Sequence, residues 1–382
     1  MNVAINNKAL HIGVSFLSFG KNVFGGMEKG WYNLCQGFLE NNHGVSVFTG
    51  CMTGVSSEID GIKIYRSSCL PKKVGGNTAD LATKLVVERE NIKKDFDDYQ
   101  KTYKPDHLIL VDPLWGILQV SEAWKISNAP ISISYHIANR SGVRREIMAT
   151  SFQIPYRRRF AVSKFLIEEI NREFLESESK EIIVKPTPTY IGDYIKEYPT
   201  ENYIFCNSRI DPIKRIDTLV YAFSKIHKKY QIKLKLCGGG SPFMDLNSEL
   251  EKIKKIVKDL KLEKEVEFLP RLEWEEIPEL VLKSKLIVLP SSRETFGGAA
   301  LEALVAGRPL VTTTGGNLPV LAGRSGVIVE PGNIESLAGA MDEVLGNYAK
   351  YEHKALNGRE LFNKFDRKVV AGEMLDHLLR KG

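Results

Sequence analysis

Short apolar segments rich in β-branched residues alternate with longer helical segments along almost the whole chain, and this alternation is its most restrictive feature. Alternating strands and helices indicate an α/β fold with parallel sheets. The strands predicted in the first half are 11–19, 45–49, 62–66, 107–112, 130–136, 160–163 and 182–185. Helices are predicted there over 27–41, 80–103, 114–126 and 164–175.

A proline-rich break divides the chain near its middle. Pro186 and Pro188 block a helix and discourage a central strand, so we place a linker from there to about residue 201. Because 382 residues exceed what one compact core usually holds, we expect two tandem Rossmann-like domains, 1–190 and 191–360. The strands predicted in the second domain are 203–208, 233–237, 266–269, 285–290, 309–313 and 327–329.

The last segment, 361–382, has apolar residues at the spacing of an amphipathic helix. Phe362, Phe365, Val369, Met374 and Leu378 are among them. We expect one helix over 361–379 that packs back onto the N-terminal domain.

The composition is that of an ordinary globular protein. Hydrophobic residues at 43% and charged residues at 26% exclude a disordered chain, a collagen or a disulfide scaffold. The five cysteines are scattered and form no C-x-x-C pair, which favours a reducing compartment. No apolar run approaches the roughly 18 to 20 residues of a membrane span, and no signal peptide is recognised. We therefore expect a cytoplasmic protein.

The net charge of +6 is unevenly distributed. Residues 140–164 contain seven basic side chains and a single acid, Glu146. Such a patch fits an anionic acceptor, or peripheral association with an anionic membrane at its inner face. An ordinary solvated helix and loop fit equally well. No nucleic-acid partner is predicted.

A candidate ligand loop at 291–298 follows the buried strand 285–290 and opens a helix that runs to about residue 306. Gly297 and Gly298 allow a ligand close to the backbone, and the first helical turn attracts an anion such as a pyrophosphate. Glu294 lies just before the helix and Glu302 eight residues later, so both can bind hydroxyls in one cleft. Taken singly, each is an ordinary helix-terminus or solvent-facing glutamate.

Two other strand ends of the same domain carry suitable loops. Arg209 and Lys214 follow the strand 203–208, and a guanidinium fork with a point-charge ammonium suits a diphosphate. Gly239 lies in a glycine-rich turn after the strand 233–237. Ligands of doubly wound sheets bind beyond the carboxyl ends of the strands, so these loops are expected to converge on one cleft. Exposed surface turns are the alternative.

These segments, in this order, resemble the retaining glycosyltransferases of family four, which have the GT-B fold. In that fold two Rossmann-like domains face each other across a cleft. The resemblance includes the family's E-x7-E motif, here Glu294 and Glu302, and extends over about 110 residues. Its other parts are Arg209 with Lys214, the turn 238–240, the segments 290–297 and 302–309, and Gly315 with Gly316. Val320 stands where the family often has glutamate, which leaves the donor base and the acceptor open.

The resemblance implies a role for each matching residue of the second domain. Arg209 and Lys214 would hold the donor diphosphate, Glu294 would contact the transferred sugar, and Glu302 would bind the ribose. Backbone groups of the remaining residues would complete the donor site: Phe296, Gly297 and Gly298 at the sugar and phosphate, Gly239 in its turn, and Arg271 with Leu272 at the base.

The first domain matches the family more loosely. Gly25 and Gly26 resemble its Gly-Gly loop, which faces the donor phosphate and the acceptor, and they do not form the G-x-G-x-x-G of a nicotinamide site. His136 ends a strand and resembles the histidine beside the donor sugar, although a structural histidine fits equally well. Asp112 ends another strand and suits either an acceptor contact or a helix cap.

The expected function is retaining transfer of a hexose-type sugar from a nucleotide-diphosphate sugar to a hydroxyl of a glycan, lipid-linked or small-molecule acceptor. UDP-sugar is favoured as the donor and GDP-sugar is the second choice. No metal or other cofactor is predicted, because no H-E-x-x-H and no convincing D-x-D pair occurs. The alternatives are a sugar-nucleotide epimerase or phosphorylase on a GT-B scaffold, or a non-catalytic nucleotide-sugar-binding protein.

Overall fold

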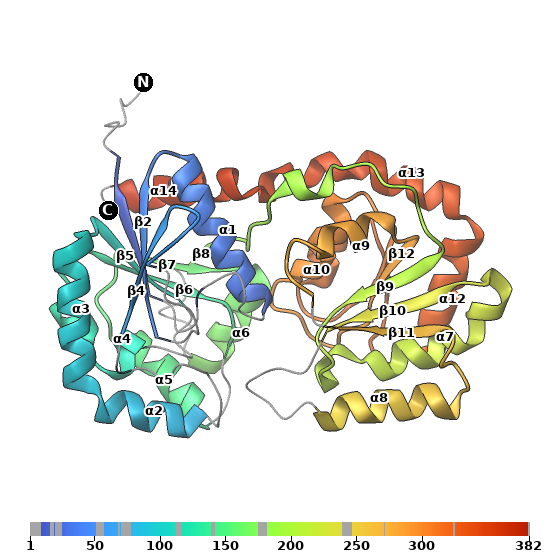
Figure 1. Ribbon diagram of the computed structural model, residues 1–382, viewed down its shortest axis with the longest axis horizontal. Coiled ribbons are helices and arrows are strands. Elements are labelled where there is room, and N and C mark those ends of the chain that lie inside the picture. The colour runs from blue at the N-terminus through green and yellow to red at the C-terminus, as the bar shows by residue number, and fades with distance from the viewer. Residues whose placement is uncertain are drawn as a thin grey trace. The chain divides into compact units, whose positions relative to one another are not determined.

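The chain divides into two compact units, each with a sheet and flanking helices (Figure 1). Unit 1 consists of Met1–Pro188 together with Arg367–Gly382, and unit 2 of Thr189–Asp366. The boundaries expected at 190 and 360 therefore lie at 188 and 366. The computed structural model describes residues 9–15, 19, 25–50, 57–67, 69, 78–111, 117–138, 142–174, 182–238, 247–270, 272–323 and 325–380.

Unit 1 contains an eight-stranded sheet in the order β3-β4-β2-β1-β5-β6-β7-β8. All neighbouring strands are parallel except β3 and β4. Central strands such as β5, with the sequence HLILV, are buried throughout, as expected for a parallel sheet covered on both faces. The strands are β1 His11–Ser15, β2 Gly44–Thr49, β3 Glu58–Ile59, β4 Ile62–Arg66, β5 His107–Val111, β6 Ile131–Tyr135, β7 Arg158–Ala161 and β8 Ile182–Val184.

The helices of unit 1 differ from the predictions in three places. The single helix expected over 80–103 is two helices that meet at Glu88, and the one expected over 114–126 is a short α-helix followed by a 3-10 turn. Helix α5 was not predicted as a separate element, because its segment was interpreted as a basic patch or as an ordinary solvated helix and loop. The helices are α1 Gly26–Glu40, α2 Thr78–Val87, α3 Arg89–Tyr103, α4 Ile117–Val120, η2 Ala123–Ile126, α5 Gly142–Ser151, α6 Lys164–Phe174 and α14 Arg367–Leu379.

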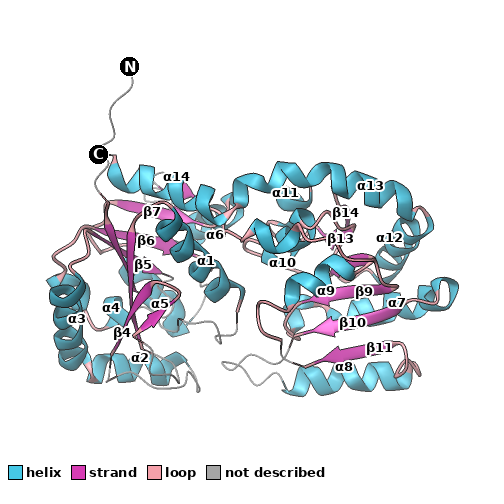
Figure 2. Ribbon diagram, turned by 45° about the horizontal axis from the view of Figure 1, so that its top comes forward, coloured by secondary structure: helices cyan, strands magenta, loops and turns pink. Residues whose placement is uncertain are grey.

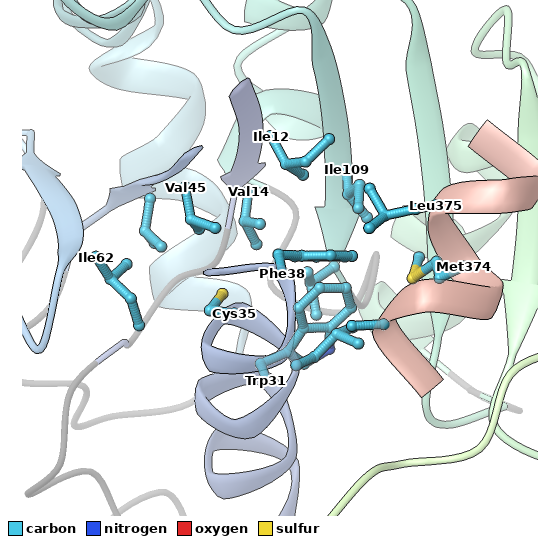
Figure 3. Packing of buried hydrophobic residues seen from close by; sticks show 14 of the residues in the cluster. Ile12, Val14, Trp31, Cys35, Phe38, Val45, Ile62, Ile109, Met374 and Leu375 are labelled. Carbon is cyan, nitrogen blue, oxygen red and sulfur yellow. The ribbon is translucent and has the colours of Figure 1, made fainter. Parts of the chain in front are cut away.

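The C-terminal helix α14 is part of the core of unit 1. Its Met374 and Leu375 pack beside Trp31 and Phe38 of α1 (Figure 3). The backbones of α1 and α14 come so close that a Cβ on Gly37 would overlap the carbonyl oxygen of Arg367. The start of α14 is held as well, since Arg367 Nε donates a 2.8 Å hydrogen bond to Glu40 Oε1.

Unit 2 contains a six-stranded, all-parallel sheet in the order β11-β10-β9-β12-β13-β14. The order runs backwards from β9 and forwards from β12, which makes the boundary between these two strands the topological switch point of a doubly wound sheet. The strands are β9 Tyr203–Asn207, β10 Lys233–Cys237, β11 Val266–Leu269, β12 Leu286–Leu289, β13 Leu310–Thr313 and β14 Val327–Val329. Both sheets confirm the predicted α/β fold with two Rossmann-like domains.

Helices cover both faces of this sheet (Figure 2). They are η4 Ile191–Tyr194, η5 Pro212–Lys214, α7 Ile216–Tyr230, α8 Asn247–Asp259, α9 Ile277–Lys283, α10 Gly298–Val305, α11 Leu318–Ala322, α12 Ile334–Gly346, α13 Tyr348–Gly358 and η6 Arg359–Phe365. The single helix expected over 361–379 is thus wrong, because the chain becomes extended at Asp366 between η6 and α14.

The two segments at which the chain leaves unit 2 lie side by side. Thr189 N donates to Phe365 O at 3.0 Å, and Ile191 N donates to Asp366 Oδ2 at 3.2 Å. Asp366 interrupts the expected helix because its carboxylate holds the incoming linker.

Candidate functional site

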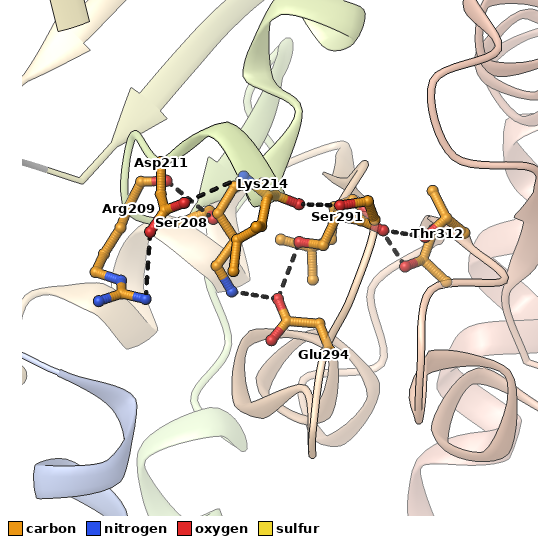
Figure 4. Close-up of polar contacts among 11 residues, drawn as sticks. Ser208, Arg209, Asp211, Lys214, Ser291, Glu294 and Thr312 are labelled. Atoms are coloured by element: carbon orange, nitrogen blue, oxygen red, sulfur yellow. Dashed lines mark hydrogen bonds and ion pairs between the residues drawn. The ribbon is translucent and has the colours of Figure 1, made fainter. Parts of the chain in front are cut away.

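The loops that carry the predicted diphosphate and sugar residues meet at the switch point of unit 2. Lys214 belongs to the loop after β9, and Glu294 to the loop after β12, the strand that pairs with β9. Lys214 Nζ donates a 2.5 Å hydrogen bond to Glu294 Oε1 (Figure 4). The structure therefore brings together two predicted site residues that lie 80 positions apart in the sequence.

Ser291 completes the environment of the Glu294 carboxylate. Its hydroxyl donates to Glu294 Oε1 at 2.9 Å, so one carboxylate oxygen accepts from both Ser291 and Lys214. The side chains of Lys214 and Glu294 are 13% and 21% exposed, so this ion pair is shielded from most solvent screening. Two hydrogen bonds to one oxygen therefore set the orientation of the Glu294 carboxylate.

Arg209 lies on the same loop as Lys214 and is the more accessible of the two cations. Its side chain is 39% exposed, and Nη2 lies 3.7 Å from Asp211 Oδ2. Asp211 is itself occupied, because Oδ1 accepts from Ile213 N and caps the short helix η5. Asp211 therefore positions the loop and loosely pairs with Arg209, whose guanidinium remains open to a ligand.

The turn at Gly316 packs against the backbone of the Glu294 loop. Gly316 has a φ of +70°, and a Cβ on it would overlap the carbonyl oxygen of Glu294. Asn317 extends the support, because its backbone N donates to Glu294 O and its side-chain Nδ2 donates to Phe296 O, both at 2.9 Å. Glycine at 316 is required here by both the backbone conformation and the close approach.

Glu302 lies inside α10 and is only 7% exposed. Asn207, the last residue of β9, donates from Nδ2 to Glu302 Oε2 at 2.9 Å. The buried hydroxyl of Tyr194 in η4 also hydrogen-bonds to Glu302, and burial and this carboxylate raise the pKa of Tyr194 well above its usual range. The structure excludes the alternative of Glu302 as an ordinary solvent-facing glutamate, since its carboxylate is held by two protein groups.

Helix α10 begins at Gly298, in the segment where the sequence predicts the start of a helix. Gly297 precedes the helix with a φ of +97°, and Phe296 before it is buried. Gly298, the first residue of α10, has no atom within 4 Å of the position that a Cβ would occupy. The first turn of α10 therefore has open space beside it, where an anion can approach the amides.

The other predicted site residues of unit 2 are Gly239, Arg271 and Leu272. Gly239 and Arg271 lie outside the described residues. Leu272 is half-buried in the loop that follows β11.

In unit 1, His136 follows the carboxyl end of β6 and is 8% exposed. Trp31 Nε1 donates a 2.8 Å hydrogen bond to His136 Nε2, and Ser134 Oγ lies 3.4 Å from the same nitrogen. Burial lowers the pKa of His136 to about 3, so the ring is neutral at physiological pH. Asp112, the other strand-end candidate of this unit, lies outside the described residues.

Gly25 and Gly26 lie where α1 begins, as predicted, but an internal carboxylate lies against the first of them. Glu28 is buried, and its Oε2 occupies the position that a Cβ on Gly25 would take. Gly26 has open space at the corresponding position. A negative side chain at a helix N-terminus is favourable, and Glu28 places one in the first turn of α1.

Four residues of the basic segment make contacts within unit 1. Arg157 and Arg158 each donate from Nη2 to the carbonyl of Arg380 at 3.2 Å, near the end of α14. Arg145 donates to Glu173 O at 3.3 Å. Arg159 is buried with its guanidinium 3.8 Å from the ring centre of Tyr156. These contacts give part of the basic segment a role in the fold of unit 1.

The described residues contain neither a metal-ligand cluster nor a membrane-spanning helix. In this part of the chain, no three His, Cys, Asp or Glu side chains come together as a metal site. Within the same residues, none of the helices is both long and apolar enough to span a bilayer.

The structure adds site residues that the sequence did not single out: Asn207, Ser291, Tyr194, Asn317 and Trp31. Asn207 and Ser291 lie at the ends of predicted strands. A polar residue at the end of a buried strand is a sequence feature that could have identified both. Tyr194 and Trp31 carry no comparable signal, because their partners Glu302 and His136 are more than 100 residues away.

Comparison with known proteins gives a family match for unit 2. Residues 193–361 match the model of the family described as Glycosyl transferases group 1, which covers most of unit 2. The N-acetyl-alpha-D-glucosaminyl L-malate synthase of Bacillus anthracis is 30% identical over 170 residues, 43% of this chain and 42% of that enzyme. The aligned part is less than half the length of this and other curated relatives that the chain matches.

Solved structures resemble the chain over nearly its full length. Sucrose-phosphate synthase from Thermosynechococcus elongatus has a TM-score of 0.80 at 20% identity, covering 96% of this chain and 98% of that one. The Anabaena protein HepE in complex with UDP and glucose has a TM-score of 0.77 at 18% identity, covering 97% and 99%. At these identities the likeness establishes the fold. The chain therefore has the GT-B fold, and its residues 193–361 match the glycosyl transferases group 1 family.

Proposed function

We propose that this chain is a retaining glycosyltransferase that moves a hexose-type sugar from a nucleotide-diphosphate sugar, preferably a UDP-sugar, to an acceptor hydroxyl. The acceptor is a glycan, a lipid-linked sugar or a small molecule. The observation that carries the proposal is the Lys214–Glu294 pair at the switch point of a unit that matches a glycosyltransferase family. The preference for UDP is supported by two proteins of similar fold that have been solved with UDP bound, HepE and a mutant of TarM from S. aureus.

Each donor group has a suitable partner in unit 2. Arg209 and Lys214 bind the diphosphate, and the open backbone at Gly298 accepts a phosphate or sugar oxygen beside the first turn of α10. Glu302 accepts hydrogen bonds from the ribose hydroxyls, and Asn207 and Tyr194 keep its carboxylate in place. Glu294 accepts hydrogen bonds from hydroxyls of the transferred sugar.

The reaction in this proposal proceeds on one face of the sugar. The bond from the anomeric carbon to the diphosphate breaks as the acceptor hydroxyl attacks, and a diphosphate oxygen takes the hydroxyl proton. Lys214 and Arg209 stabilise the negative charge that develops on the leaving diphosphate, which is electrostatic catalysis by groups fixed in advance. No protein nucleophile takes part.

Isothermal titration of UDP into Glu302→Ala tests the ribose assignment. We expect UDP affinity to fall at least tenfold, because two hydroxyl hydrogen bonds are lost from a buried site. Glu335→Ala is a matched control, since it removes an exposed glutamate of the same unit that pairs only with Lys225 among the contacts described. Unchanged UDP affinity in Glu302→Ala, with wild-type thermal stability, would show that the assignment is wrong.

A transfer assay with a panel of nucleotide sugars tests the activity itself. We expect a UDP-sugar to be consumed with formation of UDP in the presence of an acceptor hydroxyl, and the anomeric configuration of the product to be that of the donor. Lys214→Met should abolish this turnover while the fold is kept. A product of inverted configuration contradicts the retaining mechanism, and binding of UDP-sugar without any transfer to the acceptors tested points to the non-catalytic alternative.

A further inference from the structure

Trp31 and His136 form a buried hydrogen bond in unit 1, with 2.8 Å between Trp31 Nε1 and His136 Nε2. An indole nitrogen can only donate, so Nε2 of His136 is the acceptor and carries no proton. A neutral imidazole then carries its single proton on Nδ1. We propose that Trp31 is a positioning residue that fixes His136 as the neutral Nδ1–H tautomer and limits it to donating through Nδ1 to a substrate hydroxyl.

The surroundings of Trp31 hold its indole in one orientation. It lies in α1 and is 1% exposed, within the cluster formed by α1, α14 and the central strands. Side chains in such close-packed cores occupy single rotamers, so the direction of Nε1 is set by the fold. The rings of Trp31 and His136 lie 5.9 Å apart between centroids with a 58° tilt, a geometry in which the indole edge points at the imidazole.

The position of His136 links this tautomer to substrate binding. His136 directly follows β6, at the carboxyl edge of a parallel sheet, where ligands of such folds bind. Since the Nε2 lone pair is used by Trp31, His136 does not take a proton from a substrate hydroxyl unless this bond breaks. The inference rests on the proposed function only for the identity of the substrate, because the tautomer follows from the hydrogen bond alone.

Long-range ¹H–¹⁵N spectra of the full chain labelled on histidine test the tautomer directly. In the wild type we expect Nδ1 of His136 to be the protonated nitrogen and Nε2 the unprotonated one, with His136 assigned by its absence from His136→Asn. In Trp31→Phe, the apolar bulk is largely kept and the donor is lost, so both tautomers should appear in exchange. Trp124→Phe removes an indole from η2 of the same unit and should leave the spectrum of His136 unchanged.

Kinetics of two histidine variants test the direction of donation. Asn at position 136 places an amide N–H near the position of Nδ1, whereas Gln places its amide near Nε2. We expect His136→Asn to keep kcat/KM within roughly tenfold of the wild type and His136→Gln to lose more. Trp31→Phe should lower kcat/KM roughly tenfold and leave the affinity for UDP unchanged, because Arg209, Lys214 and Glu302, the side chains proposed to hold its diphosphate and ribose, lie in unit 2.

Several outcomes overturn the inference. A protonated Nε2 in the wild type contradicts it whether or not Trp31→Phe folds, and so does an unchanged His136 spectrum in a folded Trp31→Phe. Better activity of His136→Gln than of His136→Asn contradicts donation through Nδ1. Failure of the proposed function is distinct from these results, because a wild-type protein that neither binds UDP nor transfers sugar still reports its tautomer in the spectra.

Discussion

Lys214 and Glu294 form an ion pair, with 2.5 Å between Nζ and Oε1. The cation proposed for the diphosphate is therefore already partnered by the carboxylate proposed for the sugar. A donor has to attract Lys214 away from Glu294, or share it, when its diphosphate arrives. The affinity for the nucleotide then depends on the charge of Glu294 as well as on the charge of Lys214.

We predict that Glu294→Gln binds UDP several-fold more tightly than the wild type and transfers sugar more slowly. The neutral amide still accepts hydrogen bonds from Lys214 and Ser291, so the loop keeps its shape, but it no longer competes with a diphosphate for the ammonium. Isothermal titration at low and high salt measures the affinity. Lys214→Met should have the opposite effect and weaken UDP binding at least tenfold, and equal or weaker binding by a folded Glu294→Gln contradicts the competition.

We predict that Gly298→Ala folds with wild-type stability and loses donor binding. Its Cβ meets no atom within 4 Å in the free protein, and alanine is favourable in a helix, so the fold should tolerate the methyl group. The same methyl group would occupy the space through which a phosphate approaches the first turn of α10. Thermal unfolding should therefore give a wild-type midpoint, whereas titration should show weaker binding of UDP. Wild-type UDP affinity in this variant would contradict the proposal that the first turn of α10 contacts the donor.

We predict that Gly316→Ala destabilises unit 2 by about 2 kcal/mol or more and impairs transfer. A Cβ at this position overlaps the carbonyl of Glu294, and a φ of +70° is unfavourable for alanine. Gly339→Ala is the matched control. Gly339 lies within α12 with open space around it, so alanine there should stabilise the protein by roughly 0.5–1 kcal/mol. Equal denaturation midpoints for the two variants would contradict the prediction.

We predict that the protein loses stability as the pH falls from about 7 towards 4, partly because of His107. Burial first, and then the charge of Arg157, lower the pKa of His107 to about 4 from its usual 6.5. Between these values the unfolded chain binds more protons than the folded one, so the stability present above pH 6.5 is lost on acidification. The loss from this residue is on the order of 3 kcal/mol.

His107→Gln tests this dependence, because glutamine does not titrate and can still bond to Ser132, whose Oγ lies 2.9 Å from His107 Nε2. Denaturant unfolding at pH 7 and pH 4.5 should show a smaller pH effect in the variant than in the wild type. His136 titrates in the same direction, so the dependence should be reduced and not abolished. If the free energy of unfolding falls equally between pH 7 and pH 4.5 in both proteins, groups other than His107 cause the loss of stability.

Most strands and the loops that carry the donor site were predicted from local patterns. The segment HLILV of β5 is a continuous apolar run, which indicates a buried parallel strand whatever surrounds it. Lys214 and Glu294 were recognised because each follows such a strand. Their direct pairing was not foreseen, since it depends on which strands are neighbours in the sheet.

The errors arose where distant segments decide the local structure. Nothing near Asp366 marks a break in the helix predicted over 361–379, because the group that competes for its carboxylate is the amide of Ile191. Glu88 is different, because it interrupts 80–103 without a glycine or a proline and its side chain accepts a local hydrogen bond from Asn91. The hydrogen bonds of Tyr194 to Glu302 and of Trp31 to His136 also join residues more than 100 positions apart, so the local sequence does not predict them.

The place of α14 in the core of unit 1 determines the order in which the chain can mature on the ribosome. Unit 2 is complete once Asp366 has been synthesised, whereas the cluster of Trp31 and Phe38 waits for Met374, Leu375 and Leu378. The segment made first therefore acquires its final packing last. Chains truncated after Asp366 and released from the ribosome should hold a native unit 2, together with an N-terminal region that is still open to chaperones and proteases.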